Sequence, residues 1–240
     1  MTINGLSGSL SPNSDLSSPW ITILSALPNL KTIKQLLGSA RDLFDKITNN
    51  GVYEVLDYKS TLELKDPVGR GAVFKKHEKV RYLQDNIIAY QDQAWGDGKT
   101  LIQYRCTPGI PVDRYRSGYK THILISLREV KAKGDIDDFI IEWKIREGFL
   151  EKSGFWATEI SHRTRQVSVR LIFPKSRSPL SVFLVERNSQ KNYALDDSLK
   201  MQLPDGRWSI TWRKTQPRQF EQYILRWDWQ CLFRFQIRRP

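Results

Sequence analysis

Short segments in which apolar and polar residues alternate recur through the second half of the chain. In residues 166–173 the apolar side chains are Val167, Val169, Leu171 and Phe173, and polar residues lie between the first three of them. Successive side chains of a β-strand point to opposite faces, so this spacing is typical of strands with one buried face. The pattern therefore predicts a mainly β fold.

Two later segments, residues 207–213 and 223–229, repeat this alternation with tryptophans on one face. Turn-forming residues at 203–206 and a loop containing Pro217 precede them. Short strands at this spacing favour a two-sheet sandwich, and in this pattern residues 151–240 resemble an immunoglobulin or fibronectin-type domain. The resemblance is architectural only. The paired cysteines of antibody domains are absent, so it implies no function.

Residues 51–150 carry similar strand and turn signals. Apolar and β-branched segments on either side of residues 65–69 predict a hairpin. We expect a second strand–turn–strand unit around residues 96–98 and a third hairpin around residues 133–135. The sequence thus predicts two antiparallel β-sandwich-like domains, residues 51–150 and residues 151–240.

The N-terminal 50 residues differ in character. Residues 1–28 are rich in serine and predict a flexible tail with a short apolar patch that begins at Trp20. In residues 29–50 apolar side chains recur every three or four positions, which predicts one amphipathic α-helix. Its expected interface residues are Leu30, Ile33, Leu37, Ala40, Phe44 and Ile47. This stripe fits packing on its own domain, self-association or contact with a partner chain.

Positive charge is concentrated in the predicted second sandwich. The chain has 38 Lys and Arg against 26 Asp and Glu, a net charge of +12. Residues 151–240 hold 17 basic and 8 acidic residues, and 12 of the basic residues are arginine. Because the guanidinium fork matches phosphate and carboxylate groups, this composition favours an acidic partner.

Strand alternation also predicts where some of these arginines point. If the tryptophans of residues 207–213 face the core, the residues between them face outward. The arginines expected to share an outward surface are Arg170, Arg207, Arg213 and Arg226. Cross-strand pairing with acidic neighbours such as Glu186 or Asp228 is the alternative.

Catalytic and cofactor signatures are absent from the sequence. The histidines His77, His122 and His162 lack metal-ligand spacing, so neither a metal nor a cofactor is expected. Cys106 and Cys231 form neither a disulfide framework nor a CxxC pair, which favours a reducing compartment. The N-terminus lacks signal-peptide features, and we expect a cytoplasmic location.

Together these features predict a non-catalytic recognition or adaptor protein, a subunit of a larger complex. Its expected partner is an acidic macromolecule, either nucleic acid or an acidic protein surface, bound by the arginine-rich sandwich. One alternative is a peripheral membrane protein anchored by residues 20–48, and the other is an enzyme with a site that is not visible in the sequence.

Overall fold

The computed structural model describes residues 51–95 and 99–229, and they lie within one compact unit, Lys46–Pro240. The expected tail at residues 1–28 lies outside the described residues. So does the expected helix at residues 29–50, with its interface residues Leu30, Ile33, Leu37, Ala40, Phe44 and Ile47.

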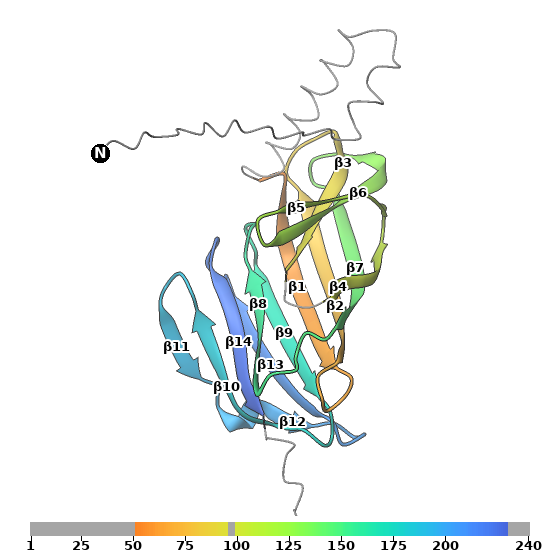
Figure 1. The fold of residues 1–240 in the computed structure, drawn as a ribbon. Helices are drawn as coiled ribbons and strands as arrows, with labels where there is room; N and C mark the ends of the chain where they lie inside the picture. Colours follow the sequence, from red (N-terminus) through yellow and green to blue (C-terminus); the bar gives the residue numbers. More distant parts are fainter. Residues whose placement is uncertain (1–50, 96–98, 230–240) are drawn as a thin grey trace, which may run out of the picture. The chain divides into compact units, whose positions relative to one another are not determined.

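The described chain is mainly β, which confirms the fold class that the alternating pattern predicts (Figure 1). The first seven strands are β1 (Tyr53–Leu64), β2 (Gly71–Tyr82), β3 (Ile87–Ala94), β4 (Lys99–Thr107), β5 (Ile110–Ser117), β6 (Lys120–Lys131) and β7 (Ile136–Arg146). The later elements are β8 (Ser153–Glu159), β9 (Gln166–Phe173), β10 (Pro179–Glu186), β11 (Lys191–Ala194), the 3-10 helix η1 (Asp197–Leu199), β12 (Lys200–Gln202), β13 (Trp208–Thr215) and β14 (Gln222–Trp229).

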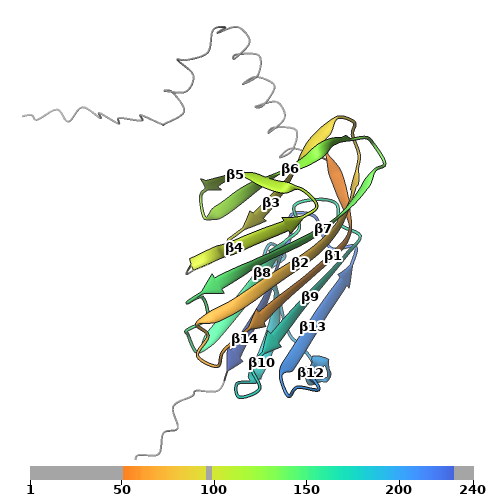
Figure 2. The same ribbon diagram turned by 90° about the vertical axis from the view of Figure 1, so that its right-hand side faces the viewer.

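The largest sheet has seven strands in the order β12-β13-β9-β1-β2-β7-β4 (Figure 2). Strands β1 and β2 form the hairpin predicted around residues 65–69, with Leu64 opposite Ala72. Strand β1 also pairs in parallel with β9, and Leu62 lies opposite Leu171. The two segments expected as separate β-rich domains therefore share one continuous sheet.

Two smaller sheets complete the fold, with the orders β11-β10-β14-β8 and β3-β6-β5. The strand–turn–strand unit predicted around residues 96–98 does not pair with itself, because β3 pairs with β6 and β4 pairs with β7. The hairpin predicted around residues 133–135 is also wrong, since β6 and β7 belong to different sheets. A turn signal shows that the chain reverses, but it does not choose the strand that is paired.

Aromatic residues fill the space between the seven-stranded and four-stranded sheets. Trp227 of β14 is fully buried, and its ring centroid lies 5.5 Å from that of Phe173 on β9 at 79°. Trp212 of β13 lies 4.9 Å from Tyr223 of β14. These edge-to-face and tilted contacts join two sheets into a sandwich-like layer pair.

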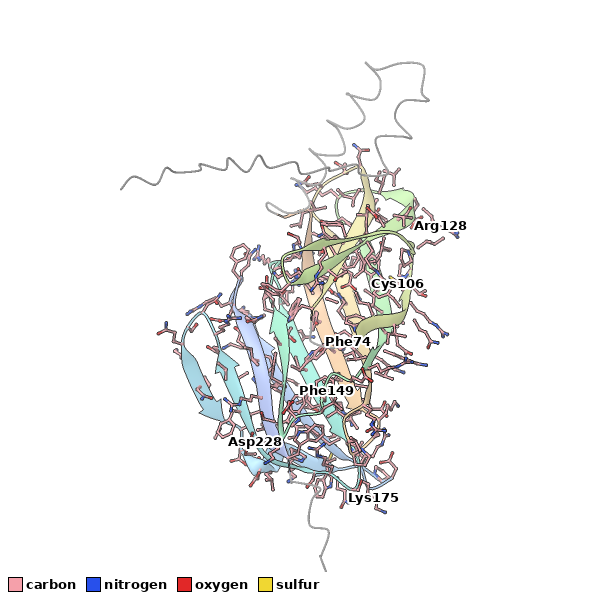
Figure 3. All side chains as sticks on the ribbon, viewed as in Figure 1. Phe74, Cys106, Arg128, Phe149, Lys175 and Asp228 are labelled. Atoms are coloured by element: carbon pink, nitrogen blue, oxygen red, sulfur yellow. The ribbon has the colours of Figure 1, made fainter. Side chains whose placement is uncertain are left out.

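The three-stranded sheet also packs on the seven-stranded sheet through aromatic side chains. The ring of Tyr90 on β3 stacks on that of Phe139 on β7, with centroids 4.0 Å apart. In Figure 3, Phe74 and Phe149 lie in the interior, whereas Arg128 and Lys175 lie at the periphery. Within residues 51–95 and 99–229, no helix is long and apolar enough to cross a membrane.

Candidate functional site

The inward face of β2 carries two charged residues in the middle of an otherwise apolar row. Phe74 and Val80 on this face are 2% and 0% exposed. Between them, in the same alternation, Lys76 is 7% exposed and Glu78 is 6% exposed. Charged groups at such positions are costly unless they are paired and hydrogen-bonded, so this row requires polar partners from a neighbouring strand.

Strand β3 supplies those partners. Lys76 Nζ lies 2.5 Å from Oδ1 of Asp92, which is 1% exposed, and 2.7 Å from Glu78 Oε2. Lys76 Nζ also donates to the Tyr90 hydroxyl at 3.3 Å. An ammonium group has three hydrogens, and these three contacts use all of them.

Two tyrosine hydroxyl groups complete the charged centre. Tyr90 donates to Glu78 Oε2 at 2.9 Å, and Tyr104 on β4 donates to Asp92 Oδ2 at 2.8 Å. Both oxygens of Asp92 are thereby occupied. Glu78 Oε1, in contrast, accepts no hydrogen bond from the part of the chain that the structure describes.

The electrostatics of this centre keep Lys76 charged. Burial lowers the pKa of Lys76, but the carboxylates of Asp92 and Glu78 raise it more, so the pKa lies well above its ordinary value. Burial raises the pKa of Tyr58 to about 12 and that of Tyr90 well above 10.0, so both phenols are neutral near pH 7. One ammonium therefore faces two carboxylates, which leaves one negative charge.

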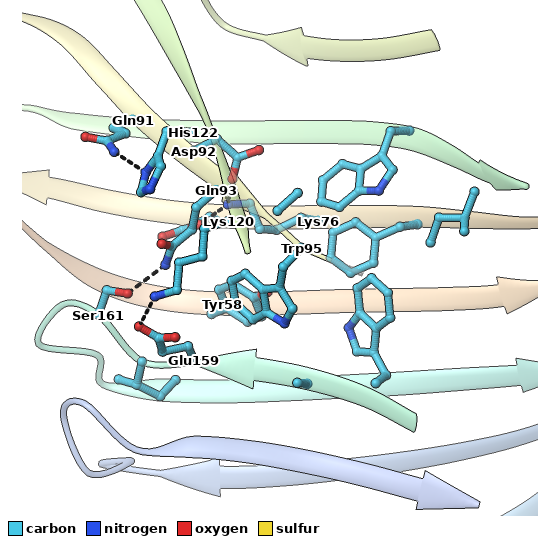
Figure 4. Close-up of a pocket in the computed structure, with 18 of the residues that line it drawn as sticks. Tyr58, Lys76, Gln91, Asp92, Gln93, Trp95, Lys120, His122, Glu159 and Ser161 are labelled. Carbon is cyan, nitrogen blue, oxygen red and sulfur yellow. Dashed lines mark hydrogen bonds and ion pairs between the residues drawn. The ribbon is translucent and has the colours of Figure 1, made fainter. Parts of the chain in front are cut away.

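A cavity of about 390 Å³ lies beside the charged centre (Figure 4). Its aromatic lining comes from several strands and includes Tyr53, Tyr58, Phe74, Trp95, Trp143 and Trp156. The Phe74 ring lies 4.2 Å from the Trp143 ring and 4.7 Å from the Trp156 ring. The cavity thus combines apolar ring faces with a small number of buried charged groups.

Polar contacts connect the three-stranded sheet to β8 and the loop after it. Lys120 Nζ on β6 lies 2.7 Å from Glu159 Oε1 on β8, and Gln93 donates to Ser161 Oγ at 2.7 Å. Figure 4 shows both contacts beside the cavity. They join two walls of the cavity that are distant in sequence.

Gln91, a further lining residue, leaves an acceptor unused. Its Nε2 lies 2.5 Å from His122 Nδ1 and 3.2 Å from the Tyr115 hydroxyl, so both amide hydrogens have partners. Gln91 Oε1 is buried and has no partner among the described residues. Buried polar atoms without a partner are uncommon and require an explanation.

No group of three or more His, Cys, Asp or Glu residues within 51–95 and 99–229 is arranged to hold a metal ion. Glu78 Oε2 and both oxygens of Asp92 contact Lys76 or a tyrosine hydroxyl.

Three of the four arginines predicted to share a surface belong to the same sheet face. In the seven-stranded sheet Arg170 pairs with Thr211, and Ser168 pairs with Arg213, so Arg170 and Arg213 lie on its outer face. Arg207 is two residues before Ser209 on this face, and it forms ion pairs with Glu63 at 2.5 Å and Asp205 at 2.7 Å.

Arg226 does not join these three arginines. It lies on β14 in the four-stranded sheet, where its cross-strand neighbours are Phe183 and Phe155. Alternation predicted correctly that Arg226 is exposed. It could not predict that β14 lies in a different sheet from β9 and β13, because the strand partner is set by long-range packing.

The cavity residues were missed at the sequence level, although a signal for them existed. The alternation of residues 72–82 places Lys76 and Glu78 on the same side as Phe74, Val80 and Tyr82. Charged residues in an inward register are rare and mark a site that needs partners. Asp92 carries a similar signal, because Tyr90, Asp92 and Ala94 alternate as buried residues after the register shift at the start of β3.

Comparisons with known proteins give no family for this chain. No protein-family model matches it, and no curated protein sequence matches it significantly. A mutant of an M1 zinc metallopeptidase from Deinococcus radiodurans, with a bound Tyr-Ser-Ala substrate, has a TM-score of 0.47 at 10% identity. Another structure of an M1 zinc metallopeptidase from Deinococcus radiodurans has a TM-score of 0.42 at 12% identity. A two-domain M1 zinc metallopeptidase mutant bound to L-tryptophan has a TM-score of 0.44 at 10% identity.

These similarities cover 72%, 73% and 73% of this chain but 42%, 42% and 43% of the metallopeptidase chains. The chain therefore spans less than half the length of those structures. Similarity at this level identifies neither a shared fold nor a shared activity.

Proposed function

We propose that the protein is a non-catalytic binding protein that holds a small organic molecule in the cavity beside Lys76. The observation that carries this proposal is that Glu78 Oε1 has no hydrogen-bond partner among the described residues and lies next to an aromatic-lined cavity of about 390 Å³. Ligand sites commonly have volumes of about 300–1,000 Å³, apolar walls and a few placed polar groups. The cavity matches each of these properties.

Stability alone gives a poor reason for the charged centre. A buried ion pair gains little over well-packed apolar side chains of similar volume, because desolvation offsets the attraction. Glu78 is 6% exposed and yet has an oxygen without a protein partner. A ligand that donates a hydrogen bond to this oxygen would explain why charged residues occupy these buried positions.

Ligand-observed NMR with a library of small aromatic molecules tests the proposal on the full-length protein. We expect saturable binding that becomes about tenfold weaker or more in Trp156→Ala, which removes one aromatic wall. Trp208→Ala is the matched control, because Trp208 is also partly exposed and lies outside the cavity. Absence of binding, or equal binding by both variants, would overturn the proposal.

A second candidate function is recognition of an acidic macromolecule by the outer face of the seven-stranded sheet. It is supported by the position of Arg170 and Arg213 on adjacent strands of this face. Lys59 of β1, which forms an ion pair with Asp57, lies on the same face opposite Ser168. Within the described residues, Arg213 is exposed and forms no ion pair. Such a row of cations suits a phosphate backbone, and its affinity should fall as salt rises.

Binding of a DNA duplex measured against salt concentration tests this second candidate. Replacing Arg170, Arg207 and Arg213 with Ser should weaken binding and reduce the salt slope by about 0.9 for each phosphate contact that is lost. Arg226→Ser is the control because Arg226 lies in the other sheet. An equal loss of DNA affinity in the control and in the triple variant would count against this surface. Binding to an acidic protein but not to DNA would favour the acidic protein as the partner.

We also retain two finer expectations as proposals. An immunoglobulin-like topology for residues 151–240 is supported by the pairing of β9 with β13 in one sheet and of β10 with β14 in the other. A cytoplasmic location rests on the low cysteine content of the sequence.

A further inference from the structure

The ammonium hydrogens of Lys76 at the charged centre are already in use. The three hydrogens of Lys76 contact Asp92, Glu78 and Tyr90. A ligand that needs the Lys76 ammonium as a donor would have to break one of these contacts.

One hydrogen-bond acceptor of the charged centre has no protein partner in the described part of the chain. Glu78 Oε1 accepts no hydrogen bond from the described residues. The complementary ligand group is therefore a hydrogen-bond donor. An acceptor-only group, such as a carboxylate, would face oxygen atoms.

The net charge of the centre also favours a ligand with a positively charged donor group. Lys76 provides one positive charge against the two carboxylates of Glu78 and Asp92, and all three residues are at most 7% exposed. Charge interactions are stronger at such sites than in water. A bound cation would neutralise the remaining negative charge, whereas an anion would increase it.

The aromatic lining of the cavity also suits a ligand that combines a cation with a flat apolar group. Lys76 Nζ lies 5.9 Å from the Tyr58 ring centroid and 5.7 Å from the Tyr90 ring centroid, so the site already places one cation over aromatic faces. Ring faces attract cations and also pack against flat apolar groups. Phe74, Trp143 and Trp156 provide further apolar surface for such a body.

We propose that the ligand is an organic cation, with an ammonium or guanidinium group directed to Glu78 Oε1 and a flat apolar body against the aromatic lining of the cavity. This inference rests on the proposed function of the cavity as a small-molecule site. It assigns a ligand class by charge and by donor pattern.

Three indole compounds with the same ring and different charges separate the possibilities. Isothermal titration calorimetry on the full-length protein compares tryptamine, neutral 3-methylindole and anionic indole-3-acetate. We expect tryptamine to bind at least about tenfold more tightly than 3-methylindole, and indole-3-acetate to bind most weakly. Tighter or equal binding of the neutral or anionic compound overturns the cation assignment and leaves the cavity function standing. Binding of none of the three contradicts both proposals.

A variant locates the preference at one oxygen. Glu78→Gln should remove most of the difference between tryptamine and 3-methylindole, because it removes the negative charge of the carboxylate whose Oε1 has no protein partner among the described residues. Glu142→Gln is the control, since Glu142 pairs with Lys75 on the outer face of the sheet. If Glu78→Gln keeps the full preference, the assignment to Glu78 is overturned. The comparison of the three compounds on the unmodified protein tests the cation assignment even if this variant does not fold.

Discussion

Lys76 on β2 and Asp92 on β3 form a buried ion pair of 2.5 Å that joins the seven-stranded sheet to the three-stranded sheet. The stacked rings of Tyr90 and Phe139 connect the same two sheets. The charged centre of the cavity is therefore also part of the contact that holds the cavity wall in place. Substitutions in it should affect both stability and binding.

Lys76→Met should destabilise the protein strongly. The substitution leaves Glu78 and Asp92 buried without their cation, and loss of one partner from a buried pair costs about 3–5 kcal/mol. Urea unfolding of the variant measures the change. Lys79→Met on the exposed face of β2 is the control and should change the free energy of unfolding by less than about 0.5 kcal/mol. Similar effects of both substitutions would show that the pair has no structural role.

Gly154→Ala should destabilise the protein because the added methyl group would clash with the Trp227 ring. A Cβ at Gly154 would lie 2.5 Å from Cζ2 of the fully buried Trp227. Overpacking of this kind typically costs about 1–3 kcal/mol. Gly71→Ala is the control, because its nearest contact would be 3.4 Å from Asp66 Oδ2. A melting temperature unchanged by Gly154→Ala would contradict the packing described for Trp227.

Stability should fall on acidification through His162. Its ring lies 4.2 Å from the Tyr53 ring, and burial lowers its pKa, with Glu78 opposing and Lys76 reinforcing this effect. The folded protein thus binds a proton less readily than the unfolded chain, whose histidine titrates near 6.5. The contribution is complete above that pH and is lost as pH falls below it, by at most about 1.4 kcal/mol per pH unit.

Urea unfolding at about pH 7.5 and about pH 5.5 measures the effect of His162. His162→Phe keeps a ring beside Tyr53 and cannot be protonated, so it should reduce the loss of stability at the lower pH. His77→Gln, at the ion pair with Asp138 on the outer sheet face, serves as the comparison. An equal loss in the His162 variant and the unmodified protein would contradict the prediction.

The sequence predicted local structure better than it predicted strand pairing. Alternation located the strands that contain Val167, Trp212 and Trp227, because burial of one face imposes a period of two. It also grouped Arg170 with Arg213. It failed for Arg226, whose strand belongs to the opposite sheet, because sheet membership depends on contacts that no local pattern encodes.

The charged centre could be predicted only in part. Inward-facing Lys76 and Glu78 follow from the alternation around Phe74 and Val80. Their pairing with Asp92 does not follow, because β3 pairs with β6 and not with β4, the next strand in the sequence. The cavity is therefore a tertiary feature, assembled from strands that are distant in sequence.

An amide-resolved NMR titration of the isotope-labelled full-length protein with tryptamine tests the central claim most directly. Saturable shifts should be largest at Lys76, Glu78 and Asp92, whose side chains form the charged centre. The amides of Arg170 and Arg213, on the outer face of the seven-stranded sheet, should be unaffected. Shifts centred on those arginines, or no saturable shifts at the three cavity residues, would contradict a ligand site in the cavity.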